Sequence, residues 1–202
     1  MLWFDTFKFG VVASLGLQYP PIGLTSANMQ ITGQAYGNYQ YTVTHSSTLA
    51  APTYDGFHLF DYILTSDGTF WASNNSFNNA TGVYSGSANK NAITGEWVQI
   101  ISSTAITITS YRITGRNDLY SDAGLPASWV LLGSTNGGST WMTLDTQTGL
   151  TASSWSKGVY NTYTIASPSA FNTYAIVVRS TIPYPTTPAS FCNIGELQLF
   201  GL

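Results

Sequence analysis

Charged residues are scarce in this chain of 202 residues. Lysine, arginine, aspartate and glutamate together make up 7% of it, whereas a typical soluble protein has roughly 25%. The 6 basic and 9 acidic residues give a net charge of -3, and the basic residues form no run. We therefore expect no nucleic-acid binding, because neutralising phosphates requires clustered Lys and Arg. The same shortage argues against binding to anionic membranes.

Cysteine and histidine are almost absent. Cys192 is the single cysteine, so the chain can form neither an intrachain disulfide nor a cysteine-based metal site. The two histidines, His45 and His58, belong to no recognisable catalytic motif, and there is no phosphate-binding loop. Glu96 and Glu196 each open an expected strand, and we interpret them as structural hydrogen-bonding groups rather than the paired acids of a glycosidase. We expect Cys192 to be a buried, inert thiol and the protein not to be an enzyme.

No hydrophobic run near the N-terminus is long enough to span a bilayer. The longest uncharged one there, Phe9 to Leu17, is too short for a membrane helix, and Asp5 cancels Lys8 where a signal peptide would be basic. Pro20 and Pro21 then interrupt any helix or central strand. We expect an apolar N-terminal arm over residues 1–27, a single domain over residues 28–202, and no membrane insertion.

Aromatic and β-branched residues are plentiful, in contrast to charge. Hydrophobic residues make up 44% of the chain and aromatic residues 14%. They recur in short runs separated by Gly, Pro, Asn and Ser, the pattern of strands joined by turns. The runs are Tyr39–Val43, Phe57–Leu64, Glu96–Ile101, Ala105–Ile113, Trp129–Leu132, Thr140–Leu144, Val159–Ile165, Tyr174–Val178 and Ile194–Phe200. This spacing predicts an all-β sandwich or barrel.

The dipeptide Asn136-Gly137 is a strong hairpin signal because both residue types tolerate positive φ. A two-residue loop at this point would place Leu132 opposite Trp141. Gly138 leaves room for a longer loop, which would shift the register.

Several short motifs follow one another in an order that resembles a known family. They are LFD (59–61), TFW (69–71), TGVYSG (81–86), GEWVQI (95–100), ITSYRITGRND (108–118), SWVLLGSTNGGSTW (128–141) and NIGELQLFG (193–201). The series, over residues 31–201, resembles the discoidin or coagulation-factor type C family of galactose-binding-like domains. The YPP segment followed by ITGQAYGNYQY looks like a variety found in proteins of large DNA viruses.

The resemblance implies a jelly-roll β-sandwich whose loops at one end form a binding surface. Members of the family are mostly non-catalytic and bind glycans, lipid head groups or proteins. This sequence departs from the family pattern in two ways. The cysteine pair that ties the termini together in animal members is missing, and the segment between Asp61 and Thr69 is longer than the usual short turn.

Many members hold a structural calcium ion, although no cofactor is required for binding. Hard cations prefer several carboxylate and carbonyl oxygens. By resemblance, the calcium ligands would be Asp61, Asp67, Thr69 and Glu196. The alternative interpretation is that Asp67-Gly68 only forms a turn and that Glu196 binds backbone amides.

A glycan site is implied at the motif GRND, where sugar-binding relatives carry an arginine after a strand. A guanidinium group can grip neighbouring hydroxyls, and planar side chains stack on sugar faces. The candidate ligand-binding residues are Arg116, Asn117, Asp118, Trp71, Phe191 and Asn193. The alternative is that Arg116 pairs with Asp118 or Asp122 to fasten its own loop, and that Trp71 belongs to the core.

Two functions fit these observations. The first is a non-catalytic structural or adhesive subunit of a virion, such as a minor capsid or capsid-surface protein of a large DNA virus, or of a similar surface assembly. Its apolar arm would contact other copies or neighbouring capsid or surface proteins, and its location would be a virion or an extracellular surface. The alternative is a lectin-like module that recognises cell-surface glycans.

Overall fold

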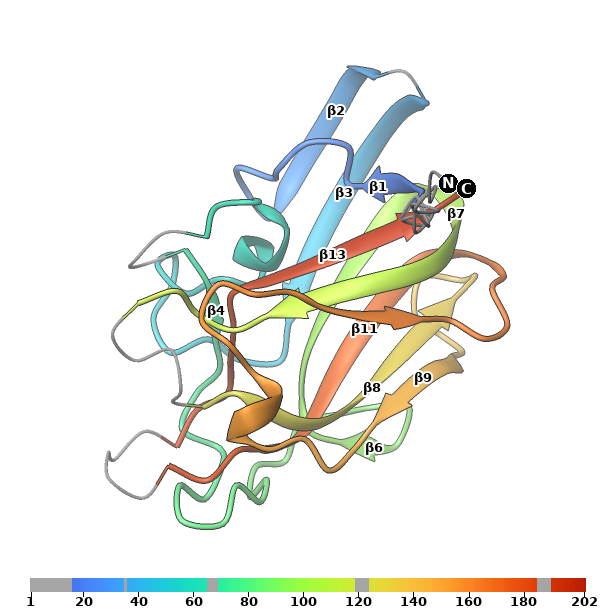
Figure 1. The fold of residues 1–202 in the computed structure, drawn as a ribbon. Coiled ribbons are helices and arrows are strands. Elements are labelled where there is room, and N and C mark those ends of the chain that lie inside the picture. Colours follow the sequence, from blue (N-terminus) through green and yellow to red (C-terminus); the bar gives the residue numbers. More distant parts are fainter. Residues whose placement is uncertain (1–15, 35, 65–68, 119–123, 185–189) are drawn as a thin grey trace, which may run out of the picture.

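Strands account for nearly all of the regular structure (Figure 1). The computed structural model describes residues 16–34, 36–64, 69–118, 124–184 and 190–202. The strands are β1 (Leu17–Tyr19), β2 (Asn28–Gln34), β3 (Gly37–His45), β4 (Trp71–Ala72), β5 (Asn89–Lys90), β6 (Ile93–Thr94), β7 (Glu96–Thr114), β8 (Pro126–Ser134), β9 (Met142–Gln147), β10 (Asn161–Thr164), β11 (Ala170–Thr181), β12 (Asn193–Ile194) and β13 (Glu196–Gly201). Two short 3-10 helices, η1 (Gly56–Phe60) and η2 (Ala152–Ser154), interrupt them. The expected all-β class is confirmed. None of the helices in the described ranges is long and apolar enough to cross a membrane.

The long strand β7 joins the two layers of the sandwich. Its first part pairs with β3 and β11, and its last part pairs with β10 and β13. One layer therefore has the order β2-β3-β7-β11-β8-β9, and the other has the order β1-β13-β7-β10. All of these pairings are antiparallel (Figure 1).

The core lies between the layers and follows the alternation of the strands. Side chains on successive residues of a strand point to opposite faces, so Val98 and Ile100 of β7 are buried on the inner face with Trp129 of β8. The outer face of the first layer carries a second, smaller apolar cluster. It consists of Val130, Leu132, Ala175 and Val177, against which Ile93, Trp97 and Trp141 pack.

Part of the expected N-terminal arm is built into the sandwich. β1 pairs with β13, with Tyr19 opposite Leu199, and both Tyr19 and Leu24 are buried in the core. The backbone amide of Leu24 donates to the carbonyl of Phe60 at 2.8 Å. Residues 1–15 lie outside the described part, and the domain boundary at residue 27 stays a prediction.

The hairpin between β8 and β9 has the longer of the two loops that the sequence allowed at Asn136-Gly137. Leu132 pairs with Thr143 rather than with Trp141, so the loop is longer. Ser134 Oγ accepts a hydrogen bond from the amide of Gly138 at 2.9 Å, which closes the loop around its own polar groups. Gly137 and Gly138, with φ of 68° and 93°, adopt the left-handed backbone conformation that this turn needs and that glycine tolerates.

Candidate functional site

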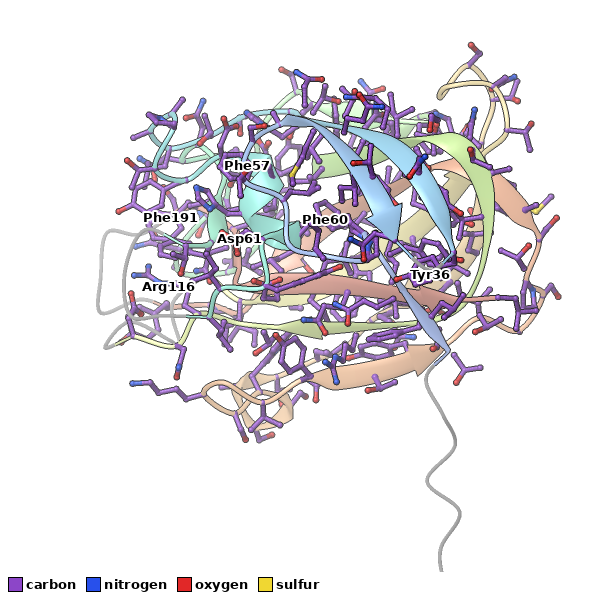
Figure 2. The ribbon with its side chains drawn as sticks, turned by 90° about the horizontal axis from the view of Figure 1, so that it is seen from above. Tyr36, Phe57, Phe60, Asp61, Arg116 and Phe191 are labelled. Carbon is purple, nitrogen blue, oxygen red and sulfur yellow. The ribbon has the colours of Figure 1, made fainter. Side chains whose placement is uncertain are left out.

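Three loops meet at one end of the sandwich, which we call the loop end. β12 pairs with β4, so the C-terminal loop lies beside the loop that leads into β4. The amide of Asn193 donates to the carbonyl of Gly124 at 2.9 Å, which brings in the loop after β7. Figure 2 shows Asp61, Arg116 and Phe191 at this end and Tyr36 at the opposite one.

Arg116 is held within its own loop. Its Nη2 donates to Oδ2 of Asp118, and both side chains are buried. The guanidinium group also lies 4.1 Å from the centre of the Phe70 ring, a distance typical of a cation–π contact. This pairing is the loop-fastening role named above as the alternative, and Asp122 lies outside the described residues. Binding of a sugar by Arg116 stays a prediction.

Trp71 and Asn193 are completely buried, so neither side chain is exposed at the loop end, and their role in binding stays a prediction. The indole Nε1 of Trp71 donates to the carbonyl of Ser47 at 3.0 Å, so its polar group is satisfied inside the protein. The two residues lie on the paired strands β4 and β12. Both residues therefore belong to the core on which the loops of the loop end rest.

Phe57 and Phe191 are half-buried aromatic side chains among the described residues at the loop end. Phe57 was not identified as a candidate from the sequence, because the apolar run that contains it was interpreted as a strand. The run instead begins with the 3-10 helix η1, which buries Leu59 and Phe60 and leaves Phe57 partly exposed. Asp55 caps this helix by accepting from the amide of Gly56 at 3.1 Å.

Polar groups accompany these rings. Asn117 is half-buried, and its amide nitrogen donates to the carbonyl of Leu64 at 3.3 Å, so its side chain bridges two of the loops. The ring of His58 packs against that of Phe57 at a tilt of 32°, with a centroid distance of 4.1 Å. His58 Nδ1 in turn lies 2.6 Å from Oδ2 of Asp61. The loop end therefore combines flat apolar surface with amide and ring hydrogen-bonding groups.

A pair of buried carboxyl groups lies just below, formed by Glu196 and Asp61. Glu196 is fully buried, and neither of its oxygens accepts a hydrogen bond of standard geometry from the residues that the structure describes. Burial raises the pKa of Glu196 far above its usual range, and the neighbouring Asp61 carboxylate raises this pKa further. The backbone amides of Tyr62 and Ile63 lie close enough to oppose the shift without completing a hydrogen bond to Glu196. The two interpretations of Glu196, as a calcium ligand and as an acceptor for backbone amides, both stay predictions.

The chemistry of this carboxyl pair fits a hard cation. A buried carboxylate without a hydrogen-bond partner is costly unless a positive charge compensates it. Within the described ranges, no group of three or more His, Cys, Asp and Glu side chains could hold a metal ion, so backbone carbonyls would have to complete the ligand set, as is usual for calcium. Among the other expected ligands, Thr69 is half-buried at the start of the segment before β4, and Asp67 lies outside the described residues.

The remaining reactive groups have structural partners. Glu96 accepts hydrogen bonds from Ser46, Ser47 and Ser76, at 2.7 Å from Ser47 and 2.6 Å from Ser76, which confirms its expected structural role. Cys192 is fully buried, and burial raises the pKa of its thiol well above the usual value. A thiol in this state is a poor nucleophile.

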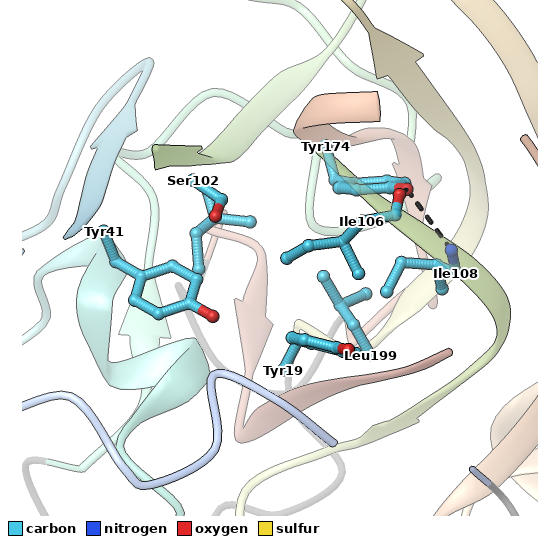
Figure 3. Close-up of a pocket in the computed structure, with 8 residues that line it drawn as sticks. Tyr19, Tyr41, Ser102, Ile106, Ile108, Tyr174 and Leu199 are labelled. Atoms are coloured by element: carbon cyan, nitrogen blue, oxygen red, sulfur yellow. Dashed lines mark hydrogen bonds between the residues drawn. The ribbon is translucent and has the colours of Figure 1, made fainter. Parts of the chain in front are cut away.

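A small cavity inside the core is lined by tyrosine and aliphatic side chains (Figure 3). Its volume is about 10 Å³, which is close to the room that one water molecule needs. Tyr174 accepts from the amide of Ile108 at 3.4 Å at its edge. Tyr41 also lines it, and burial raises the pKa of Tyr41. The cavity is too small for an organic ligand.

Comparison with solved structures identifies the fold. The family 32 carbohydrate-binding module of NanJ from Clostridium perfringens, in complex with galactose, matches with a TM-score of 0.54 and 16% identity over 79% of this chain and 92% of that chain. Chitosan-binding module 2 of the chitosanase/glucanase from Paenibacillus sp. IK-5, in complex with chitotriose, matches with a TM-score of 0.51 and 16% identity over 79% and 95%.

An F5/8 type C domain from Bacteroides fragilis matches with a TM-score of 0.55 and 15% identity over 86% of this chain and 96% of that chain. No protein-family model matches the chain, and comparison with curated proteins gives no match. The expected discoidin-type, galactose-binding-like sandwich is therefore confirmed at the level of the fold.

Proposed function

We propose that this protein is a non-catalytic carbohydrate-binding module whose loop end binds a neutral saccharide. The observation that carries the proposal is the pair of partly exposed aromatic rings, Phe57 and Phe191, at the loop end. The similar folds solved with galactose and with chitotriose support it.

The chemistry of the loop end suits a sugar. The rings offer flat apolar surface to the C–H face of a pyranose, and Asn117 and the neighbouring loops offer neutral hydrogen-bonding groups to its hydroxyls. The ion pair of Arg116 with Asp118 leaves no net charge at that position. A neutral saccharide matches such a surface better than a charged one does.

The loop end would be braced by a structural calcium ion held by Asp61 and Glu196. The buried, unpartnered carboxyl group of Glu196 supports this part of the proposal. The ion would neutralise the two carboxylates and fix the loop that leads into β4 against the start of β13.

Variants of the two rings test the proposal. Phe191→Ala and Phe57→Ala should each weaken binding of galactose or chitotriose by roughly tenfold, because each removes an aromatic contact worth about 1 kcal/mol or more. Isothermal titration calorimetry would measure the affinity. Met142→Ala, which removes an exposed apolar side chain from β9, is the matched control and should leave the affinity unchanged. If neither phenylalanine variant changes the affinity, or if the wild type binds no saccharide, the proposal is wrong.

A second candidate function is the structural subunit of a surface assembly. Leu17, Ile22 and Ile63 are exposed apolar side chains in or beside the N-terminal segment, and apolar surface of this kind favours contacts between proteins. None of the comparisons supports a capsid role, so that role and the location at a virion or extracellular surface stay predictions. Deleting residues 1–15 leaves β1 in place, and the solution mass of both forms would show whether these residues drive association.

A further inference from the structure

Arg179 is the extra residue of a bulge in β11. Val178 pairs with Trp129 of β8, and Ser180 pairs with the next residue, Ser128, so Arg179 has no partner in the register. Bulges redirect side chains and are frequent beside binding sites. The side chain of Arg179 is exposed, and its guanidinium group makes no hydrogen bond or ion pair with the residues that the structure describes.

Two adjoining hollows on the outer face of the first layer share Arg179 and Thr94 in their walls. Their volumes are about 350 Å³ and 470 Å³. Thr143 and Thr146 of β9 line the first, with Val130 beneath them. The second hollow is lined by the hydroxyl-bearing side chains of Ser128, Thr148 and Ser180, together with Val83 and the aromatic side chain of Tyr84. We call the two hollows together the outer groove. Phe57, Asp61, Arg116 and Phe191 of the loop end do not line it.

The outer groove has positive charge without compensation. Among the residues that the structure describes, no carboxylate lines either hollow. On the adjacent strand β9, Asp145 points to the core, where its Oδ2 accepts from the hydroxyl of Tyr111 at 2.5 Å. The other arginines are both engaged, since Arg112 donates to Gln198 at 2.5 Å and Arg116 pairs with Asp118. Arg179 therefore offers an unused guanidinium group in a protein with a net charge of -3.

One wall of the groove is fixed in place. The hairpin of β5 and β6 contributes Ile93 and Thr94 to it. Lys90 holds this hairpin to the sheet, because its Nζ lies 3.3 Å from the centre of the Trp97 ring and donates to Gln99 Oε1 at 2.7 Å. A wall that is already ordered lowers the entropic cost of binding a ligand.

We propose that the outer groove is a second binding site, which takes the anionic group of an acidic saccharide on Arg179. A guanidinium group binds a planar or tetrahedral oxyanion with two parallel hydrogen bonds, so a carboxylate and a sulfate share the required chemistry. The threonine and serine hydroxyls on both sides of Arg179 suit the hydroxyls of the attached sugar. This site stands independently of the loop end.

The test uses the full chain and three oligosaccharides of similar length. They are trigalacturonic acid, which carries carboxylates, a sulfated galactotriose, and neutral galactotriose. Arg179→Gln should weaken binding of the acidic probes by roughly tenfold, because it removes a charge-assisted hydrogen-bond pair. Arg179→Lys should keep only part of the affinity, because an ammonium group cannot donate two parallel hydrogen bonds to one oxyanion as a planar guanidinium group does. Lys157→Gln is the matched control, since it removes the same charge from another exposed position.

The outcomes separate this proposal from that for the loop end. Phe191→Ala should keep the affinity for the acidic probes and lose affinity for neutral galactotriose. Arg179→Gln should lose affinity for the acidic probes and keep it for neutral galactotriose. The acidic probe that binds more tightly identifies the preferred anion. The proposal is overturned if the wild type binds no acidic probe, if Arg179→Gln binds them as the wild type does, or if Lys157→Gln loses as much affinity.

Discussion

The guanidinium group of Arg116 is ion-paired with the carboxylate of Asp118 and lies 4.1 Å from the ring centre of Phe70. Both charged side chains are buried. The loop after β7 is therefore closed on itself by a charge pair. Under the proposed function, the sugar contacts come from other residues, the rings of Phe57 and Phe191, so stability and binding should be separable by mutation.

Breaking the pair should destabilise the fold. Arg116→Met or Asp118→Leu alone should each cost about 3–5 kcal/mol, because each leaves one buried charge without its partner. The double variant should cost much less than the sum, since the two residues contact each other. Urea denaturation of the four proteins would measure this coupling. Strictly additive costs would show that the pair does not exist in solution.

The stability of the metal-free protein should depend on pH through Glu196. Its pKa is raised in the folded state, so above the usual carboxyl range the folded protein binds more protons than the unfolded one. The free energy of unfolding in the presence of a chelator should therefore fall as the pH rises from about 5 toward 8. Added calcium should remove most of this decline, because it stabilises the ionised form.

Glu196→Gln is the matched variant for this effect. It keeps the shape of the side chain but cannot ionise, so it should show a flatter pH profile and a smaller response to calcium. Thermal unfolding at several pH values, with chelator or with calcium, would measure both. A variant with the pH slope and calcium response of the wild type would contradict the account of the carboxyl pair.

Trp71→Ala should lower the free energy of unfolding by about 3–5 kcal/mol, as loss of a large buried aromatic side chain generally does. Trp71 has no exposed surface, and its Nε1 is bound to the carbonyl of Ser47. Trp141→Ala is a suitable comparison, because Trp141 is only half-buried and its loss should cost less. If Trp71→Ala instead kept full stability and lost sugar affinity, Trp71 would be a binding platform.

The sequence predicted the class of fold because alternating apolar residues are a local signal. It predicted the Asn136-Gly137 turn but not its length, since the register depends on side-chain hydrogen bonds such as that from Gly138 to Ser134. It missed Phe57 because a short apolar run does not distinguish a strand from a 3-10 helix. The contact of Glu196 with Asp61 and the bulge at Arg179 depend on strands far apart in sequence, so no local pattern could reveal them.

Mapping a neutral sugar onto the protein by nuclear magnetic resonance tests the central proposal most directly. Galactose would be titrated into the labelled full-length chain, and the backbone amide shifts would be followed. The account predicts that the largest shifts cluster at the loop end, around Phe57, Asn117 and Phe191, with the outer groove around Arg179 unaffected. Shifts confined to other surfaces, or no shift with galactose or chitotriose at millimolar concentrations, would contradict it.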